Sequence, residues 1–188
     1  MKDAIKEILL TIKDEQIKER ILRLHADILH EMQTRPSSVR YHHKTEGGMY
    51  RHVHEVMVNA LAIYNLTPEL YSCTRDEVIL ATYVHDLDKL DRYIPNQDEW
   101  RKKKFDQDFD YNPDVIVVNQ TAKVVQVCAE YGLLLNNLVL NGVTFHHGGF
   151  ASDLASVYPA AQSHAMKPLS ILLHCADLIS SHIQGKGN

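Results

Sequence analysis

Residues 78–90 read VILATYVHDLDKL, a stretch that favours a helix buried on both sides. Its large apolar residues recur at helical spacing and form one stripe, made of Ile79, Leu80, Tyr83, Val84 and Leu87. The opposite face carries only small or apolar residues, apart from His85, while Asp86 lies on the flank. Because neighbouring helix positions differ by about 100°, both polar side chains can reach one ion only at a helix end or in a tight cleft.

The rest of the chain shows helical periodicity almost throughout and no internal repeat. Apolar spacing and the turn residues between apolar segments predict helices over about residues 2–32, 48–64, 76–90, 117–131, 133–145 and 168–183. Thr74 is expected to cap the third helix. Residues 91–113 are expected to form an irregular polar insert that can include a short helix, and residues 147–163 a loop. Residues 115–118 can form a short strand in place of the start of a helix. We therefore predict an all-α fold with a single domain, residues 1–188, in which an N-terminal helix (1–35) precedes a core (41–183).

Composition narrows the class of protein. The 188 residues suit one domain, and a formal net charge of -4 argues against general affinity for the nucleic-acid backbone. The three cysteines, Cys73, Cys128 and Cys175, form no CxxC pair, so we expect free, buried thiols in a reducing compartment. Charges interrupt the N-terminal apolar residues and no run is long enough to span a bilayer, so a cytoplasmic location without membrane contact is expected.

The last predicted helix contains a carboxylate in apolar surroundings. Residues 172–181 read LLHCADLISS, and apolar side chains cover nearly the whole circumference of this helix, which predicts burial. Asp177 lies in the middle, and a buried carboxylate without a partner is very costly. A metal explains it, and a salt bridge or a helix-cap contact explains it equally well.

Histidines mark two further places. His52 and His54 flank opposite edges of the apolar stripe of the second helix, and His52 follows the flexible pair Gly47-Gly48 in the first turn. For His54 an ordinary core or surface histidine is the simpler interpretation. His146 and His147 end a helix before two glycines, which suits a metal or phosphate contact as well as an exposed loop.

The combined order of these motifs resembles the HD superfamily of metal-dependent phosphohydrolases. The matching stretches are HHKTEGGMYRH (42–52), VHDLDKL (84–90), FHHGG (145–149) and LLHCADLISS (172–181). The resemblance implies an all-α, single HD-domain helical bundle whose metal-binding core covers residues 41–183. The run of HH, GG and H is most similar to the branch with bacterial 3′→5′ exoribonucleases, while the size is more similar to small nucleotide-acting members.

The resemblance also implies the metal ligands. His52 matches the first metal-binding histidine, His85 and Asp86 match the HD dyad, and Asp177 matches the closing aspartate. Asp86 is then placed to bridge the metal and the attacking water. This ligand set suits Mn²⁺, Fe²⁺, Co²⁺, Ni²⁺ or Zn²⁺ better than Ca²⁺ or Mg²⁺.

Further roles follow from the same resemblance. Lys89 matches the lysine of the HD-x-x-K motif and is expected to bind substrate phosphate and take part in catalysis. His146 and His147 match histidines near a second metal or the phosphate and are expected to be catalytic, either stabilising the leaving oxygen or donating a proton. Arg40 and His43 are expected to line the mouth of the pocket and contact substrate.

Two departures from the family pattern limit the metal count. Asp88 stands where many members have glycine, and residues 89–145 contain no histidine, although two-metal members usually have one there. We therefore expect one tight metal site and a weak or absent second one.

The expected function is removal of phosphate from a nucleotide or related ester by a metal-activated water. The alternatives are a phosphodiesterase or 3′→5′ exonuclease acting on RNA or a cyclic nucleotide, a non-catalytic nucleotide-binding HD module, and a helical interaction protein without a metal. The RKKK run at 101–104, beside Trp100 and Phe105, can contact a phosphate or base, or form a solvated turn. Oligomeric state stays open.

Overall fold

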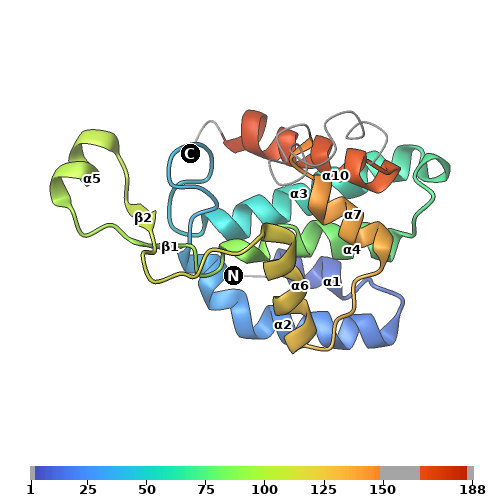
Figure 1. Ribbon diagram of the computed structural model, residues 1–188. Helices are drawn as coiled ribbons and strands as arrows, with labels where there is room; N and C mark the ends of the chain where they lie inside the picture. Colours follow the sequence, from blue (N-terminus) through green and yellow to red (C-terminus); the bar gives the residue numbers. More distant parts are fainter. Residues whose placement is uncertain (1–2, 149–165, 186–188) are drawn as a thin grey trace.

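The computed structural model describes residues 3–148 and 166–185, and it is mostly helical, which confirms the predicted all-α bundle (Figure 1). The α-helices are α1 (Ala4–Leu9), α2 (Glu15–Thr34), α3 (Gly48–Leu66), α4 (Arg75–Val84), α5 (Glu99–Phe105), α6 (Gln120–Glu130), α7 (Asn137–Phe145) and α10 (Pro168–Ile179). Short helical turns are η1 (Pro68–Leu70), η2 (Leu87–Lys89) and the π-helical turn η4 (Ser180–Gln184). Two strands, β1 (Tyr93–Pro95) and β2 (Phe109–Tyr111), pair antiparallel.

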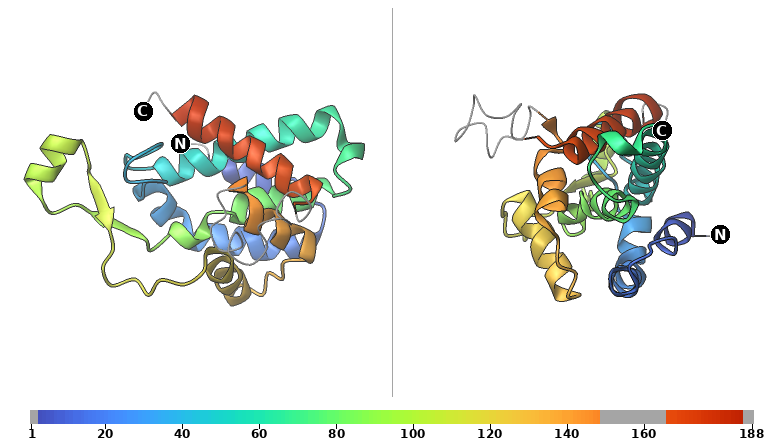
Figure 2. Two further views of the ribbon diagram at one scale, coloured as in Figure 1. Left: turned by 45° about the horizontal axis from the view of Figure 1, so that its top comes forward. Right: turned by 90° about the vertical axis from the view of Figure 1, so that its right-hand side faces the viewer.

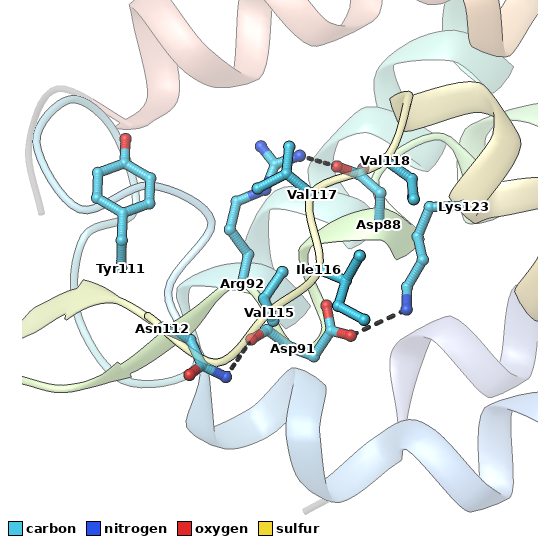
Figure 3. A pocket seen from close by; sticks show the side chains of 10 residues that line it. All are labelled: Asp88, Asp91, Arg92, Tyr111, Asn112, Val115, Ile116, Val117, Val118 and Lys123. Atoms are coloured by element: carbon cyan, nitrogen blue, oxygen red, sulfur yellow. Dashed lines mark hydrogen bonds and ion pairs between the residues drawn. The ribbon is translucent and has the colours of Figure 1, made fainter.

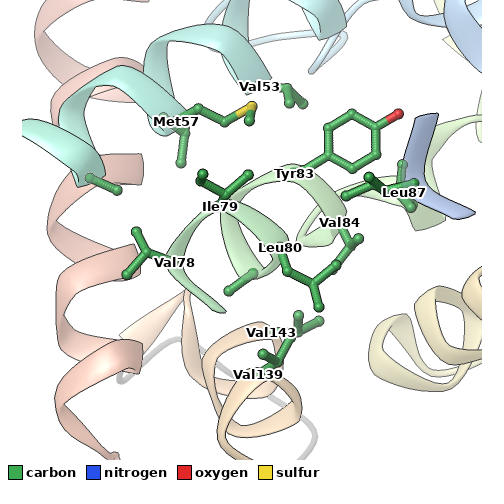
Figure 4. Close-up of a cluster of buried hydrophobic side chains, with 14 of the residues drawn as sticks. Val53, Met57, Val78, Ile79, Leu80, Tyr83, Val84, Leu87, Val139 and Val143 are labelled. Atoms are coloured by element: carbon green, nitrogen blue, oxygen red, sulfur yellow. The ribbon is translucent and has the colours of Figure 1, made fainter. Parts of the chain in front are cut away.

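Helix α4 lies at the centre of the bundle, as its sequence predicts. It packs against α3, α7 and α10, and every residue from Val78 to Val84 is buried. Figure 4 shows its apolar side chains facing Val53 and Met57 of α3 on one side and Val139 and Val143 of α7 on the other. The views in Figure 2 show α10 lying across α3 and α7. Burial on all sides leaves the end of α4 as the place where polar side chains can meet.

The ends of α4 are set by its sequence. Thr74 caps the first turn, as predicted, and forms a capping box in which it accepts a hydrogen bond from the Glu77 backbone while the Glu77 carboxylate binds the Thr74 backbone. The helix ends at Val84, six residues earlier than predicted, and η2 follows after the His85-Asp86 pair. The dyad thus lies at a helix end, where consecutive side chains can face one point.

The N-terminal segment differs from the single helix predicted for residues 1–35. Two helices, α1 and α2, form instead, and Asp14 starts the second by accepting from the backbone N–H groups of Gln16 and Ile17. The Asp76 carboxylate also accepts from the backbone N–H groups of Lys13 and Asp14, at 2.9 and 3.1 Å. The break therefore depends on a contact with α4 that periodicity in one segment cannot reveal.

The last helix is less buried than its sequence suggests. Ile171, Cys175 and Leu178 share an exposed face, so the predicted all-round burial and the predicted burial of that thiol are both wrong. Cys73 is half-buried and Cys128 is buried. Asp177 nevertheless lies on the inner face, with a relative exposure of 9%. The Asp177 carboxylate thus lies inside the bundle, although one face of α10 is exposed to solvent.

The polar insert is ordered and projects from the bundle as an arm (Figure 1). Its strands β1 and β2 flank α5, whose predicted short helix is confirmed, and Asp106 ends that helix in the left-handed region. Residues 115–118 form no strand. The helices that follow, α6 and α7, begin later than predicted, after the capping residues Asn119 and Asn136.

Two points complete the description. Most of the loop expected over residues 147–163 lies outside the described residues, as does Gly149 of the FHHGG stretch. Across the described ranges, none of the helices combines the length and hydrophobicity that a membrane span requires.

Candidate metal centre

Three elements bring the four predicted ligands together. His52 comes from the second turn of α3, His85 and Asp86 follow the end of α4, and Asp177 comes from α10. All four are buried, with relative exposures of 9% or less. His52 Nε2 lies 3.3 Å from His85 Nε2, 3.2 Å from Asp86 Oδ2 and 3.2 Å from Asp177 Oδ1.

The start of α3 is held close to the preceding loop. Gly47 has a φ of 71°, and Gly48 packs so tightly that a Cβ there would lie 1.9 Å from the carbonyl oxygen of His43. No side chain fits at that position without a backbone shift. The glycine pair thus fixes the first turn of α3, and His52 projects from the turn that follows.

Hydrogen bonds on the far side of each ring fix how the histidines present their nitrogens. His85 Nδ1 donates to the carbonyl oxygen of Thr82 at 2.7 Å, which leaves Nε2 without a proton in the neutral ring. His52 Nδ1 lies 3.0 Å from Ser180 Oγ, whose own proton goes to Glu55 Oε2 at 2.8 Å. His52 therefore donates from Nδ1 and, when neutral, also points a lone pair from Nε2 into the centre.

The result is a cluster of nitrogen and oxygen atoms that can bind a cation. The Nε2 atoms of His52 and His85 converge with the carboxylates of Asp86 and Asp177, and Asp86 Oδ1 is buried without a hydrogen-bond partner in the described residues. Ligands at about 2.1 Å from one ion lie about 3 Å apart, which is close to the spacing found here. His52, His85 and Asp86 can thus hold a metal ion, and Asp177 Oδ1 lies 3.2 Å from the His52 member of this group.

The pKa values of His52, Asp177 and His85 reflect the close approach of these side chains. Burial lowers the pKa of His52, but its hydrogen bonds to Asp177 and Asp86 outweigh burial and raise the pKa above the usual value. Burial raises the pKa of Asp177, but the bond with His52 outweighs it and holds the pKa well below the usual range. Burial alone acts most strongly on His85 and lowers its pKa, which keeps that ring neutral.

Lys89 and the two adjacent histidines, His146 and His147, also lie close to Asp86. Lys89 Nζ donates to Asp86 Oδ2 at 2.7 Å, and this carboxylate raises the lysine pKa against the effect of burial. His146 Nε2 lies 3.8 Å from Asp86 Oδ1, and its Nδ1 donates to the carbonyl oxygen of Val143. Asp86, His146 and His147 form a second group that can hold a metal, so Asp86 belongs to both groups.

Burial lowers the pKa of His146 to about 3, so its ring is neutral at neutral pH. That state suits a ligand or a hydrogen-bonding role better than proton donation. His147 is less buried, and burial lowers its pKa as well.

The predicted substrate contacts lie in different places. His43 is fully buried behind His52, where its Nε2 lies 3.0 Å from Glu55 Oε2, so it supports the centre and does not line its mouth. Arg40 is exposed and lines a separate cavity beside the arm with Lys44 and Arg101. The structure therefore brings Lys89, but neither Arg40 nor His43, into the predicted position beside the Asp86 carboxylate.

Four supporting residues were not predicted. Ser180 and Glu55 form the hydrogen-bond chain behind His52, Ser181 donates to Asp177 Oδ1 at 3.0 Å, and Gln120 Nε2 lies 3.3 Å from His146 Nε2. Glu55 and Ser181 lie three and four residues from a predicted ligand, so helical spacing could have indicated them. Nothing in the sequence indicates Gln120.

Comparison with known proteins gives one distant likeness. No family model matches this chain, and no solved structure matches it. The chain is similar to the dihydroneopterin 2′,3′-cyclic phosphate phosphodiesterase of Methanocaldococcus jannaschii. The two are 28% identical over 99 residues, which cover 46% of this chain and 40% of that protein. The matched stretch thus spans less than half of either sequence.

Proposed function

We propose that this protein is a metal-dependent phosphohydrolase of the HD type that cleaves a phosphate ester of a small organic molecule. The observation that carries the proposal is the meeting of His52, His85 and Asp86 at one buried point, with the Nε2 atoms of both rings turned toward each other. The order of the motifs supports it, and so does the likeness to a protein named as a phosphodiesterase. In this proposal residues 1–188 form one domain, with the metal-binding core at 41–183 and α1 and α2 packed outside it.

The proposed ligands are His52, His85, Asp86 and Asp177. Two imidazoles and two carboxylates favour Mn²⁺, Fe²⁺, Co²⁺, Ni²⁺ or Zn²⁺. When bound, such an ion lowers the pKa of a water and polarises the phosphoryl group. The hydrogen bonds from His85 to Thr82 and from His52 to Ser180 hold the rings in the tautomer that such a ligand needs.

The chain's own residues then handle the water and the phosphate. Asp86 Oδ1, which has no hydrogen-bond partner in the described part of the chain, accepts a hydrogen bond from the attacking water and so orients it. Lys89 holds a fixed positive charge beside that carboxylate, where it neutralises a phosphate oxygen. His146 and His147 contact the phosphate through neutral rings.

We propose one tight metal site, with the group of Asp86, His146 and His147 as a weaker second one. The tight site has two carboxylates, whereas the second group shares Asp86 and adds no further carboxylate. Fewer anionic ligands lower the affinity for a divalent cation.

The favoured substrate is a small phosphodiester, such as a cyclic phosphate on a nucleoside or a related heterocycle. The relative acts, by its name, on a cyclic phosphate, which favours a diester as the substrate. The acidic net charge and the small size of this chain favour a monoester instead, and we give the relative more weight. The net charge of -4 also disfavours a long polynucleotide. A nucleotide monoester is the second candidate, because a site with one tight metal can serve either ester.

The test is a hydrolysis screen with added Mn²⁺, Co²⁺ or Zn²⁺. Guanosine 2′,3′-cyclic phosphate, nucleoside 5′-monophosphates and a short RNA are compared for the wild type, Asp86→Asn and the exposed control Asp108→Asn. We expect metal-stimulated cleavage of the cyclic phosphate, loss with Asp86→Asn and full activity with Asp108→Asn. Wild-type protein that cleaves none of these esters, or Asp86→Asn with full activity, contradicts the proposal.

A further inference from the structure

A cavity of about 410 Å³ opens beside η2, the turn that also carries Lys89 (Figure 3). Its walls come from η2, from the end of β2 and from the segment that leads to α6. Asp88 and Arg92 line this cavity, and Asp88 lies two residues after Asp86 in the chain. The Arg92 guanidinium also contributes to lowering the pKa of His147, as expected for a charge near that ring. The cavity therefore adjoins the proposed reaction site.

The cavity is electrically balanced. Arg92 pairs with the Oδ2 atom of Asp88, and Lys123 Nζ lies 2.9 Å from Asp91 Oδ2. Figure 3 shows both pairs as dashed contacts along the cavity wall. Because each cation has its own carboxylate, the cavity is a poor site for a second phosphate and a better site for an uncharged group.

An apolar segment forms the opposite wall. Ile116 and Val117 are exposed by 85% and 89%, although both face or border the cavity with Val115 and Val118. Figure 3 shows these side chains along one stretch of chain above the cavity, with the ring of Tyr111 at its far end. Consecutive exposed aliphatic side chains beside a cavity are typical of a surface that a ligand covers.

One polar atom in the wall lacks a partner. The Asp88 side chain is 2% exposed, and Arg92 binds its Oδ2, but Oδ1 has no hydrogen-bond partner among the residues described. A buried acceptor is costly when it is left unpaired, and an ionised carboxylate can only accept hydrogen bonds. A ligand in the cavity that offers a donor can therefore satisfy this oxygen.

We propose that this cavity binds the heterocyclic part of the substrate, with a ring N–H edge donating to Asp88 Oδ1 and the ring face covering Ile116. The inference rests on the proposed function for the adjoining phosphate site and adds the substrate class. The heterocycle enters beside η2, so its ester oxygen and phosphate point toward Lys89 and Asp86 on the same turn. Asp88, which replaces a glycine of the family pattern, then selects rings that carry an N–H donor.

The test measures binding without phosphate, so it does not depend on hydrolysis. Guanosine, whose ring has an N–H beside an amino group, is compared with 1-methylguanosine, in which a methyl group replaces that ring hydrogen. Saturation-transfer NMR and calorimetry give the dissociation constants for the wild type and three variants. Asp88→Asn keeps an acceptor for Arg92 but presents an amide where Oδ1 stood, Ile116→Asp removes the apolar wall, and Leu66→Asp alters an equally exposed aliphatic residue at the end of α3.

We expect the wild type to bind guanosine about 10-fold or more tightly than 1-methylguanosine, the effect of one hydrogen bond to a charged group. Asp88→Asn should weaken guanosine by a similar factor, Ile116→Asp should weaken both ligands, and Leu66→Asp neither. Equal binding of the two nucleosides, wild-type affinity in Ile116→Asp, or no saturable binding of guanosine overturns the proposal. If Asp88→Asn fails to fold, the exposed Ile116→Asp variant still decides. A protein that binds guanosine in this way but cleaves no ester contradicts the proposed function and leaves this inference standing.

Discussion

A bound divalent metal should raise the melting temperature of the protein, because the folded chain gathers donors that the unfolded chain disperses. At a free metal concentration of 100 times the dissociation constant, binding stabilises the fold by about 2.7 kcal/mol. For a chain of this size, each kcal/mol raises the melting temperature by about 2–4 °C, so the rise should be about 5–11 °C. Chelation with EDTA should reverse it.

The assay is a thermal melt followed by circular dichroism, with and without Mn²⁺ or Co²⁺. Asp177→Asn removes the charge that lies 3.2 Å from His52 Nε2 and should reduce the rise strongly, whereas Asp108→Asn, on the exposed arm, should keep it. A melting temperature that no transition metal changes, or an equal rise in Asp177→Asn and the wild type, would refute the reasoning from converging donors.

Three further predictions follow from single contacts. Gly48→Ala should destabilise the fold by about 1–3 kcal/mol in urea unfolding, because its Cβ would meet the His43 backbone at 1.9 Å; an unchanged midpoint would contradict this. Ser180→Ala should weaken metal affinity about 10–100-fold in a chelator competition, because His52 Nδ1 loses its acceptor, and equal affinity would refute that role. Thr74→Ala should cost about 1 kcal/mol by removing the capping box, with metal uptake unchanged at a temperature where both proteins are folded.

The sequence predicts the centre of the fold well and its margins less well. Burial of α4 on both sides can be predicted because its apolar residues cover both faces, but the same pattern extends the helix to residue 90 and misses its end at Val84, before His85 and Asp86. The break after α1 depends on Asp76, which is distant in sequence, so periodicity misses it. For α10 the sequence predicts too much burial, because apolar residues on a helix face do not reveal whether another element covers that face.

The candidate site divides in the same way. The resemblance assigns its proposed ligands, because the apolar pattern alone leaves a metal and a salt bridge equally open for Asp177 and does not choose between His52 and His54. The supporting contacts of Ser180 and Gln120 depend on how helices pack, and a hydroxyl or amide in a sequence carries no sign of its partner. His43 was expected at the mouth for its place in a motif, and only the packing of the loop against α3 shows that it lies inside.

The proposed ion binding and the proposed substrate binding use different parts of the chain. The proposed ligands project from interior helices of the bundle, while the neighbouring cavity is walled largely by the segment that runs from β2 to α6. Insertions or exchanges between residues 109 and 119 should therefore alter which molecule is accepted and leave the ion-binding core untouched. Substrate preference can then change through substitutions in residues 109–119, while the residues proposed to bind the ion are kept.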